Sequence, residues 1–339
     1  MVNNDAVGEA SDRSIPQSEV LLADDLRKAY GNRPALRGLS FTLQSGRVLG
    51  FLGPNGAGKT TAIRILTTIL EPDTGSFFVD GVGSDHPERI RRRIGVLPES
   101  LGLPRYATAL EFLTFFGGLY GLAAGAARSN ALVLLQEVGL RKRAKNLIGS
   151  YSRGMRQRLG IARSLVNDPA VVFLDEPTLG LDPRGQQDLL ELVQRIARER
   201  NVGVVLCSHA LAEVESICDD VVILSSGHVV AKGSVADVIR QARGNVNQET
   251  AVRLQVPAEQ LVKAHKLLEA LPFVAAVSPQ IDRPGWLRVD LDSEPERASD
   301  HGNGVLSSLI GASIPIVSFE TQGGRLGDVF LQLTEGLGG

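Results

Sequence analysis

The first 243 residues alternate between short apolar runs and longer stretches whose apolar residues recur at helical spacing. Continuous apolar runs are typical of strands buried in a parallel sheet, and the longer stretches are typical of helices. Buried strands are predicted at 47–52, 94–97, 170–176, 202–207 and 220–225. Helices are predicted at 61–70, 153–165, 211–218 and 235–243. This alternation predicts an α/β domain.

Two parts of this domain depart from the alternation. Strand patterns at 20–23, 39–43 and 75–79 come with turn signals at 30–34 and 80–81, which indicates antiparallel strands. Helical spacing at 110–120 and 131–138 has no strand pattern between its two stretches. We therefore expect an antiparallel β subdomain and a helical insertion, at about 98–160, within one domain that spans 19–243.

A second domain is predicted at 248–339, after a polar stretch. Strands are predicted at 251–256, 273–277, 286–291 and 314–319, and helices at 258–271, 305–310 and 326–333. The order β-α-β-β-α-β is that of small α+β ferredoxin-like domains. No clustered His, Cys or carboxylate set is visible in it, so a regulatory or dimerisation role is our hypothesis, with a passive appendage as the alternative.

The apolar stretch 107–127 resembles a membrane span in its hydropathy. Glu111 and the glycines at 117, 118, 121 and 125 interrupt it, so a buried or partner-facing helix is favoured over insertion. Residues 1–18 are polar, without the basic start and apolar core of a signal peptide, and are predicted to be a disordered tail.

The composition bounds the class of protein. A length of 339 residues suggests two domains, and a net charge of -2 argues against a general nucleic-acid-binding surface. The basic clusters at 89–93 and 141–145 are interpreted as solvated helix faces. Cys207 and Cys218 are too few and too far apart for a disulfide framework or a zinc site, so reduced thiols are predicted.

The segment Gly53–Thr60 fits the pattern G-x-x-x-x-G-K-[ST] between a predicted strand and a predicted helix. Its glycines let successive backbone N–H groups converge on a polyphosphate, and the start of the helix adds its positive end. Lys59 would reach the β- and γ-phosphates, and the Thr60 hydroxyl would bind Mg²⁺. A glycine-rich turn without a ligand is the alternative, which the flanking elements disfavour. The predicted ATP-binding residues here are Gly53, Asn55, Gly56, Ala57, Gly58, Lys59, Thr60 and Thr61.

Polar side chains follow two of the predicted buried strands. Asp175 and Glu176 end the strand 170–176, at the sheet edge where ligands bind in α/β folds. Asp175 can hold Mg²⁺, and Glu176 can position or deprotonate an attacking water; two acids that only cap the next helix are the alternative. His209 follows the strand 202–207 and could contact a γ-phosphate.

Two further residues have a plain structural explanation beside a functional one. Tyr30 lies upstream of the phosphate loop, where an aromatic ring can stack on a purine or simply pack. Ser152 is a good N-cap for the helix through Leu165, and a helix start can also bind an anion.

With these motifs in place, residues 20–243 resemble the nucleotide-binding subunit of ABC (ATP-binding cassette) transporters, which are P-loop NTPases with a RecA-like core. The corresponding positions are Tyr30 for the adenine-stacking aromatic, Gly53–Thr60 for Walker A, Val171–Glu176 for Walker B, Asp182 for the D-loop and His209 for the switch histidine. Ser152-Arg153-Gly154-Met155 replaces the commoner Ser-Gly-Gly-Gln of the signature, and Glu99 replaces the Q-loop glutamine. Both variants are similar to those of ATPases that serve drug, antibiotic or polysaccharide exporters.

The resemblance implies an ATPase with Glu176, His209 and Lys59 as catalytic residues and Thr60 and Asp175 as Mg²⁺ ligands, with Glu99 as a further candidate. It implies a head-to-tail dimer with a second copy or a related subunit, in which Ser152, Arg153, Gly154, Met155 and Asp182 act on the partner's ATP. A separate membrane permease, a peripheral place on the cytoplasmic face of the membrane and export of a small molecule follow from it as expectations.

Two other classes of protein are weighed against this one. A soluble ABC-type ATPase acting on nucleic acid or ribosomes usually has two cassettes, a long coiled coil or basic arms, and this sequence has one cassette and no internal repeat. A binding module with a dead ATPase is disfavoured because Lys59, Asp175, Glu176 and His209 are all present.

Overall fold

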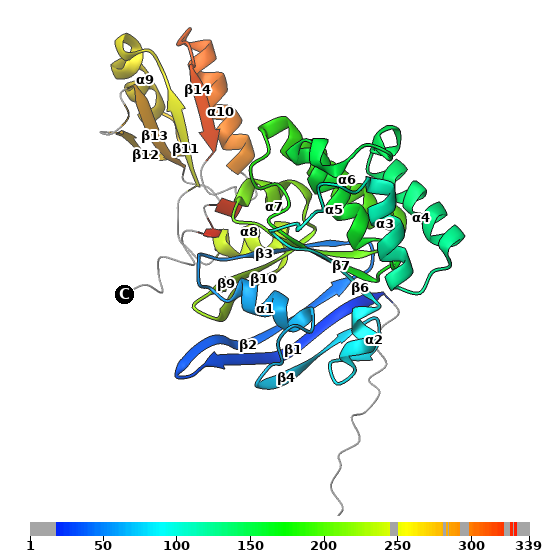
Figure 1. The fold of residues 1–339 in the computed structure, drawn as a ribbon. Helices are drawn as coiled ribbons and strands as arrows, with labels where there is room; N and C mark the ends of the chain where they lie inside the picture. Colours follow the sequence, from blue (N-terminus) through cyan, green and yellow to red (C-terminus); the bar gives the residue numbers. More distant parts are fainter. Residues whose placement is uncertain are drawn as a thin grey trace, which may run out of the picture. The chain divides into compact units, whose positions relative to one another are not determined.

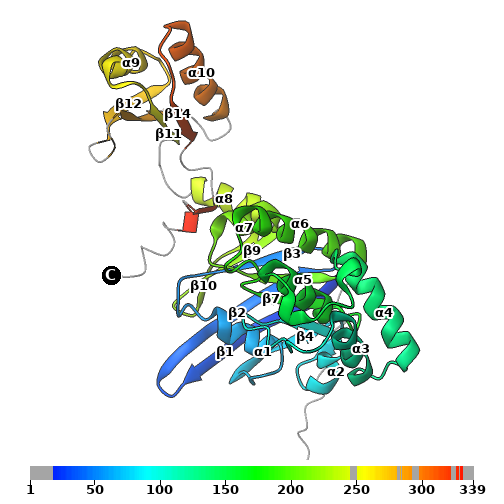
Figure 2. The same cartoon turned by 45° about the horizontal axis from the view of Figure 1, so that its top comes forward.

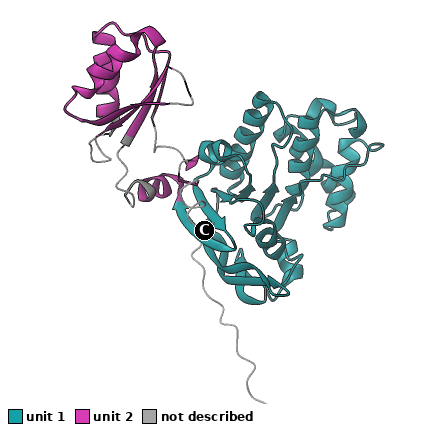
Figure 3. Ribbon diagram, turned by 90° about the vertical axis from the view of Figure 1, so that its left-hand side faces the viewer, with its two compact units in different colours: residues 1–233 teal, residues 234–339 magenta. Residues whose placement is uncertain are grey.

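The computed structural model describes residues 18–244, 250–280, 283, 285–291, 298–321, 326–327 and 329–330. Two compact units make up the chain, residues 1–233 and 234–339 (Figure 3). The predicted tail at 1–18 lies outside the described residues except for Ser18. The division between the compact units precedes α8 (Val235–Gly244), whereas the sequence prediction ends the first domain after residue 243. Amphipathic spacing cannot tell which of two neighbouring units a connecting helix joins.

The first unit contains a six-stranded sheet in the order β10-β9-β3-β8-β7-β6. Its strands are β3 (Val48–Leu52), β6 (Ile94–Leu97), β7 (Val171–Asp175), β8 (Gly203–Cys207), β9 (Asp220–Ser225) and β10 (His228–Ser234). The strand β3 pairs in parallel with β8 and β9, and β7 pairs in parallel with β6 and β8. Every residue of β3 and β8 is buried, as the continuous apolar runs predict.

A second, antiparallel sheet has the order β2-β1-β4-β5. Its strands are β1 (Glu19–Tyr30), β2 (Arg33–Gln44), β4 (Thr74–Val79) and β5 (Val82–Gly83). The predicted strands at 20–23 and 39–43 were too short, and the turn predicted at 30–34 contains only Gly31 and Asn32. Cross-strand pairing continues through the polar residues of this hairpin, which local apolar spacing does not detect.

The helix α1 (Lys59–Leu66) packs in a core shared by the two sheets (Figures 1 and 2). It begins two residues before the predicted helix and ends four residues before its predicted end. After Leu66 the Thr67 hydroxyl donates to the carbonyl oxygen of Ile63 at 2.7 Å, and Thr68 adopts a positive φ of 60°. These two threonines end the helix although the apolar spacing continues to residue 70.

Three helices, α3 (Ala109–Leu119), α4 (Ala124–Glu137) and α5 (Arg153–Ser164), form the predicted helical insertion, with α3 and α4 side by side in Figure 1. Thr108 and Glu111 form a reciprocal capping box that starts α3. The chain turns between Leu119 and Ala124, so the apolar stretch 107–127 is divided between two helices. Within the described residues, no helix combines the length and the apolar character that crossing a membrane requires.

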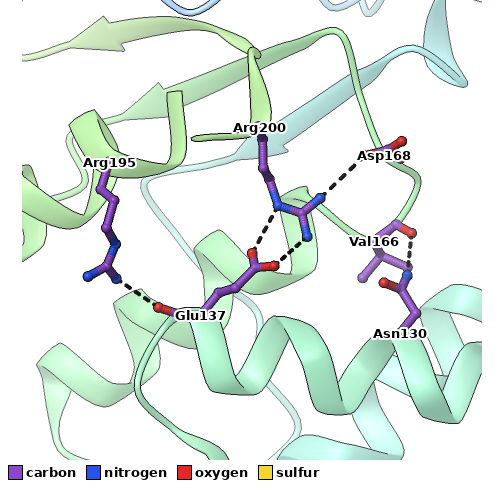
Figure 4. Close-up of polar contacts among 6 residues, drawn as sticks. All are labelled: Asn130, Glu137, Val166, Asp168, Arg195 and Arg200. Carbon is purple, nitrogen blue, oxygen red and sulfur yellow. Dashed lines mark hydrogen bonds and ion pairs between the residues drawn. The ribbon is translucent and has the colours of Figure 1, made fainter. Parts of the chain in front are cut away.

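An ion-pair network joins the end of α4 to the end of α6 (Pro183–Arg200), as Figure 4 shows. The Arg200 guanidinium donates through Nε and Nη2 to the Glu137 carboxylate at 2.9 and 2.8 Å, and through Nη1 to Asp168 Oδ1 at 3.3 Å. Arg195 Nη2 donates to the Glu137 carbonyl oxygen at 3.0 Å. The bidentate geometry fixes the helical insertion against the parallel-sheet core.

We expect Arg200→Ala to lower the thermal midpoint of unfolding. The substitution removes a two-bond charged contact and leaves a half-buried Glu137 carboxylate, a loss of about 1–3 kcal/mol. Differential scanning calorimetry measures the shift. Arg198→Ala is the matched control, because Arg198 is an exposed arginine two residues away on the same helix. Equal shifts in the two variants would contradict a structural role for the network.

The second unit has its own four-stranded sheet, in the order β12-β13-β11-β14, with every pairing antiparallel. Its elements are β11 (Thr250–Gln255), α9 (Leu261–Glu269), β12 (Val274–Pro279), β13 (Trp286–Leu291), α10 (Ala298–Gly311) and β14 (Ser318–Thr321). Their order is the predicted β-α-β-β-α-β. The last strand begins four residues later than predicted, and of the helix predicted at 326–333 the described residues 326–327 and 329–330 are helical.

The first unit also contains the α-helices α2 (Pro87–Arg91) and α7 (Leu211–Ile217). Both cysteines are buried and unpaired, which agrees with the predicted reduced thiols. Burial raises the pKa of each thiol above its ordinary range, so neither is a reactive thiolate at neutral pH.

Candidate functional site

The phosphate loop lies between β3 and α1, and two of its glycines are required by their surroundings. Gly58 has a φ of +109°, and a Cβ there would lie 2.5 Å from the carbonyl oxygen of Ala35. Gly53 has a φ of +156°, and a Cβ there would lie 2.5 Å from the carbonyl oxygen of Leu224. Only glycine combines this backbone conformation with such close backbone approaches.

Lys59 is the first residue of α1, and its side chain bends back over the loop. Its ammonium donates to the carbonyl oxygens of Gly53 and Pro54. A cleft opens beside it. The predicted site residues that line this cleft are Asn55, Gly56, Ala57, Gly58, Lys59, Thr60, Thr61, Glu99, Asp175, Glu176 and His209. The structure therefore brings the phosphate loop, the carboxylates of Asp175 and Glu176 and the histidine after β8 to one place.

Some predicted residues lie outside this lining, and some lining residues were missed. Tyr30 is the last residue of β1, is half exposed and does not line the cleft. Arg64 was missed although its place one helical turn after Thr60 was a usable signal. Ala35 and Leu179 also line the cleft, and their apolar side chains gave no signal.

The electrostatics of the cleft favour a bound cation. Burial raises the pKa of the Asp175 carboxyl, and the neighbouring carboxylates of Glu176 and Glu99 raise it further, while Lys59 and Arg64 act in the opposite direction. Mg²⁺ is held by oxygen ligands and usually takes one or two carboxylates together with substrate phosphates. The Thr60 hydroxyl and the carboxylates of Asp175 and Glu99 all line this cleft, so the donor set fits Mg²⁺. No trio of His, Cys, Asp or Glu side chains in the described part of the chain could hold a metal by itself.

Glu176 is held in an unusual backbone conformation at the end of β7. Its φ is +47°, and its backbone N–H donates to the Cys207 carbonyl oxygen at 2.9 Å, which ties it to the end of β8. Its carboxylate Oε2 lies 2.8 Å from His209 Nδ1. A non-glycine residue at positive φ is a strained feature that clusters at functional sites.

The segment that matches the ABC signature lies apart from this cleft. Ser152 caps α5 as predicted, accepting a hydrogen bond from the Met155 N–H at 3.3 Å. A Cβ on Gly180 would meet the Arg153 guanidinium carbon at 2.4 Å, so the signature contacts the loop that leads to Asp182. None of the residues predicted to act on a partner's ATP lines the cleft of its own chain.

The loop that carries Glu99 is anchored by Arg163 of α5. The guanidinium donates to the carbonyl oxygens of Val96 at 3.1 Å and Leu101 at 3.4 Å, on either side of Glu99. It also lies over the Phe116 ring of α3, 5.7 Å from the centroid. Burial lowers the pKa of this guanidinium. Sequence reasoning missed Arg163, because its partners are backbone atoms about 60 residues away.

Comparison with known proteins agrees with this arrangement. Residues 36–179 match the family described as "ABC transporter". The linearmycin resistance ATP-binding protein LnrL of Bacillus subtilis is 33% identical over 93% of this chain and 98% of its own length. The daunorubicin resistance ATP-binding protein DrrA3 of Streptomyces coeruleorubidus is 35% identical over 93% of this chain and 95% of its own. The chain belongs to the ABC transporter ATP-binding proteins.

Solved structures show the same fold. The structure of an ATP-binding subunit of an ABC transporter is 33% identical and superposes with a TM-score of 0.58, covering 66% of this chain and 92% of its own. The predicted fold of the cassette and the predicted family are confirmed. An ABC ATP-binding subunit binds and hydrolyses ATP, so this chain is an ATPase.

We expect Gly58→Ala to weaken ATP binding by at least about tenfold, while Gly56→Ala weakens it less. Both substitutions place alanine at a backbone position with positive φ, which is unfavourable by about 1–2 kcal/mol for a non-glycine residue. Only the Gly58 variant also meets a neighbouring carbonyl oxygen, because nothing lies within 4 Å of a Cβ on Gly56. Titration with a fluorescent ATP analogue measures both affinities, and equal losses would mean that loop crowding at Gly58 is unimportant.

Proposed function

We propose that this ATPase powers the export of a small molecule, a drug, an antibiotic or a lipid-like or polysaccharide cargo, through a separate membrane permease. The observation that carries the proposal is the extent of the match to LnrL and DrrA3, whose names record resistance to linearmycin and daunorubicin. A match over 93% of this chain is longer than the first unit alone, so it includes residues of the second unit. Export of a toxic compound is one way in which a transporter confers resistance.

The cleft supplies groups suited to phosphoryl transfer. In the proposed reaction the loop amides and Lys59 would bind the phosphates of ATP, and Thr60 and Asp175 would hold Mg²⁺, with Glu99 as a further candidate ligand. Bound Mg²⁺ would neutralise charge on the β- and γ-phosphates. Glu176 orients the attacking water and accepts its proton, and His209 contacts the γ-phosphate.

The proposed active form is a head-to-tail dimer with a second copy or a related ATPase subunit. The cleft of one chain lacks the signature residues, which lie beside their own D-loop instead. In the dimer, Ser152, Arg153, Gly154, Met155 and Asp182 of one copy would complete the site of the other. Closure on ATP and opening after hydrolysis would then transmit force to the permease at the cytoplasmic face of the membrane.

The proposed permease contact lies on the helical insertion and the Glu99 loop. Phe115 and Leu119 of α3 are 62% and 65% exposed and lie one helical turn apart, so they offer neighbouring apolar side chains to a partner. Arg163 links α3 to both sides of the Glu99 loop. A partner that binds α3 could therefore shift the Glu99 loop, which lines the cleft. For the second unit we propose a regulatory or dimer-stabilising role.

We expect Glu176→Gln to bind ATP, to dimerise stably with it and to lose about 10²–10⁴-fold in turnover, the size of a general-base contribution. Phosphate release measures turnover, and gel filtration with and without ATP measures dimerisation. Glu199→Gln is the control, because Glu199 is an exposed carboxylate on α6 away from the cleft. Undiminished steady-state hydrolysis in Glu176→Gln would remove Glu176 from its proposed role.

A pull-down tests the proposed partner. Tagged Glu176→Gln protein is recovered with ATP from gently solubilised membranes, and the proteins that accompany it are identified. We expect a membrane protein with several spanning helices. Recovery of ribosomes, DNA or only water-soluble partners would favour an ABC ATPase outside transport.

A further inference from the structure

A buried polar pair lies directly behind His209. Ser208 directly follows β8 and is fully buried. Glu213, in the first turn of α7, is 8% exposed. The Ser208 hydroxyl donates to Glu213 Oε2 at 2.7 Å. The same hydroxyl oxygen accepts a hydrogen bond from the Ala210 N–H at 3.0 Å. The Ser208 hydroxyl therefore bridges the residues on either side of His209, Ser208 before it and Ala210 after it.

This arrangement fixes a backbone turn with His209 at its tip. The His209 side chain is 65% exposed, so packing around the imidazole cannot hold it in place. Its Nδ1 nevertheless lies 2.8 Å from Glu176 Oε2. The backbone on either side of His209, which the Ser208–Glu213 pair constrains, therefore sets where the imidazole can lie relative to Glu176.

A buried carboxylate is an expensive way to fill this space. Removing a charged group from water is unfavourable unless hydrogen bonds compensate it, and an apolar side chain at the same place would avoid that loss. The other buried residues of α7, Val214 and Ile217, are apolar. The Glu213 carboxylate accepts a hydrogen bond from the turn that carries His209. Its presence is therefore better explained by a role in positioning that turn than by a gain in stability.

We propose that Ser208 and Glu213 are positioning residues for ATP hydrolysis, which hold His209 against Glu176. The inference rests on the proposed roles of His209 and Glu176. Loss of the Glu213 carboxylate leaves the Ser208 hydroxyl free to rotate and loosens the turn. ATP binding depends on the phosphate loop, so it stays unchanged while the hydrolytic step slows.

A double-mutant cycle separates positioning from general destabilisation. Single-turnover hydrolysis and ATP affinity are measured for Glu213→Ala, His209→Ala and the double variant of the full-length chain. We expect Glu213→Ala to slow hydrolysis about 10- to 100-fold, the size of effect that a misplaced group produces. We expect ATP affinity to stay within about twofold, and Glu213→Ala to have no further effect once His209 is alanine.

Conservative variants guard against a folding defect. Glu213→Gln keeps an acceptor for the Ser208 hydroxyl and is expected to restore most of the hydrolysis rate, and Ser208→Ala is expected to reproduce the loss. Ser216→Ala is the matched control, since its hydroxyl bonds the Glu213 carbonyl oxygen on the same helix without reaching the turn. It is expected to hydrolyse ATP at the wild-type rate.

The outcomes distinguish the inference from the function on which it rests. Unchanged hydrolysis in both Glu213→Ala and Ser208→Ala, with a clear loss in His209→Ala, would overturn the inference alone. So would equal losses from Glu213→Ala with and without His209, because a residue acting through His209 cannot have an effect without it. Wild-type hydrolysis in His209→Ala would overturn the proposed role of His209 and the inference with it.

Discussion

The backbone hydrogen bond between Glu176 and Cys207 is the contact on which the arrangement of the site depends. It joins the ends of two neighbouring parallel strands at 2.9 Å and holds Glu176 at a positive φ. The carboxyl ends of parallel strands lie at one edge of the sheet. The phosphate loop after β3, Glu176 after β7 and His209 after β8 therefore lie together at that edge. The bond fixes the backbone of Glu176 at this edge, and the Glu176 carboxylate lies 2.8 Å from His209 Nδ1.

Three polar contacts in the first unit hold one segment against another. Arg163 holds the Glu99 loop by its backbone carbonyls, and Arg200 holds the helical insertion through Glu137. Ser208 and Glu213 hold the turn that carries the histidine. Each bond is satisfied and directional, so it specifies a position that apolar packing alone would leave less sharply defined.

The phosphate loop and the signature segment of one chain lie at different places. The phosphate loop, Asp175 and Glu176 line one cleft, while the signature segment lies beside Gly180 and the approach to Asp182. The second unit has a separate apolar core and its own antiparallel sheet. Relatives with recorded drug resistance match nearly the whole chain, so both units belong to the shared architecture.

The sequence by itself determined the buried strands, the phosphate loop and the order of elements in both units, because these depend on neighbouring residues and on regular spacing. Only the tertiary structure decided the length of the β1–β2 hairpin and the unit to which α8 belongs. It also decided the anchoring by Arg163 and the Ser208–Glu213 pair. Cross-strand pairing and side-chain bonds between elements depend on which segments meet in space, and the pattern along the chain does not record those meetings.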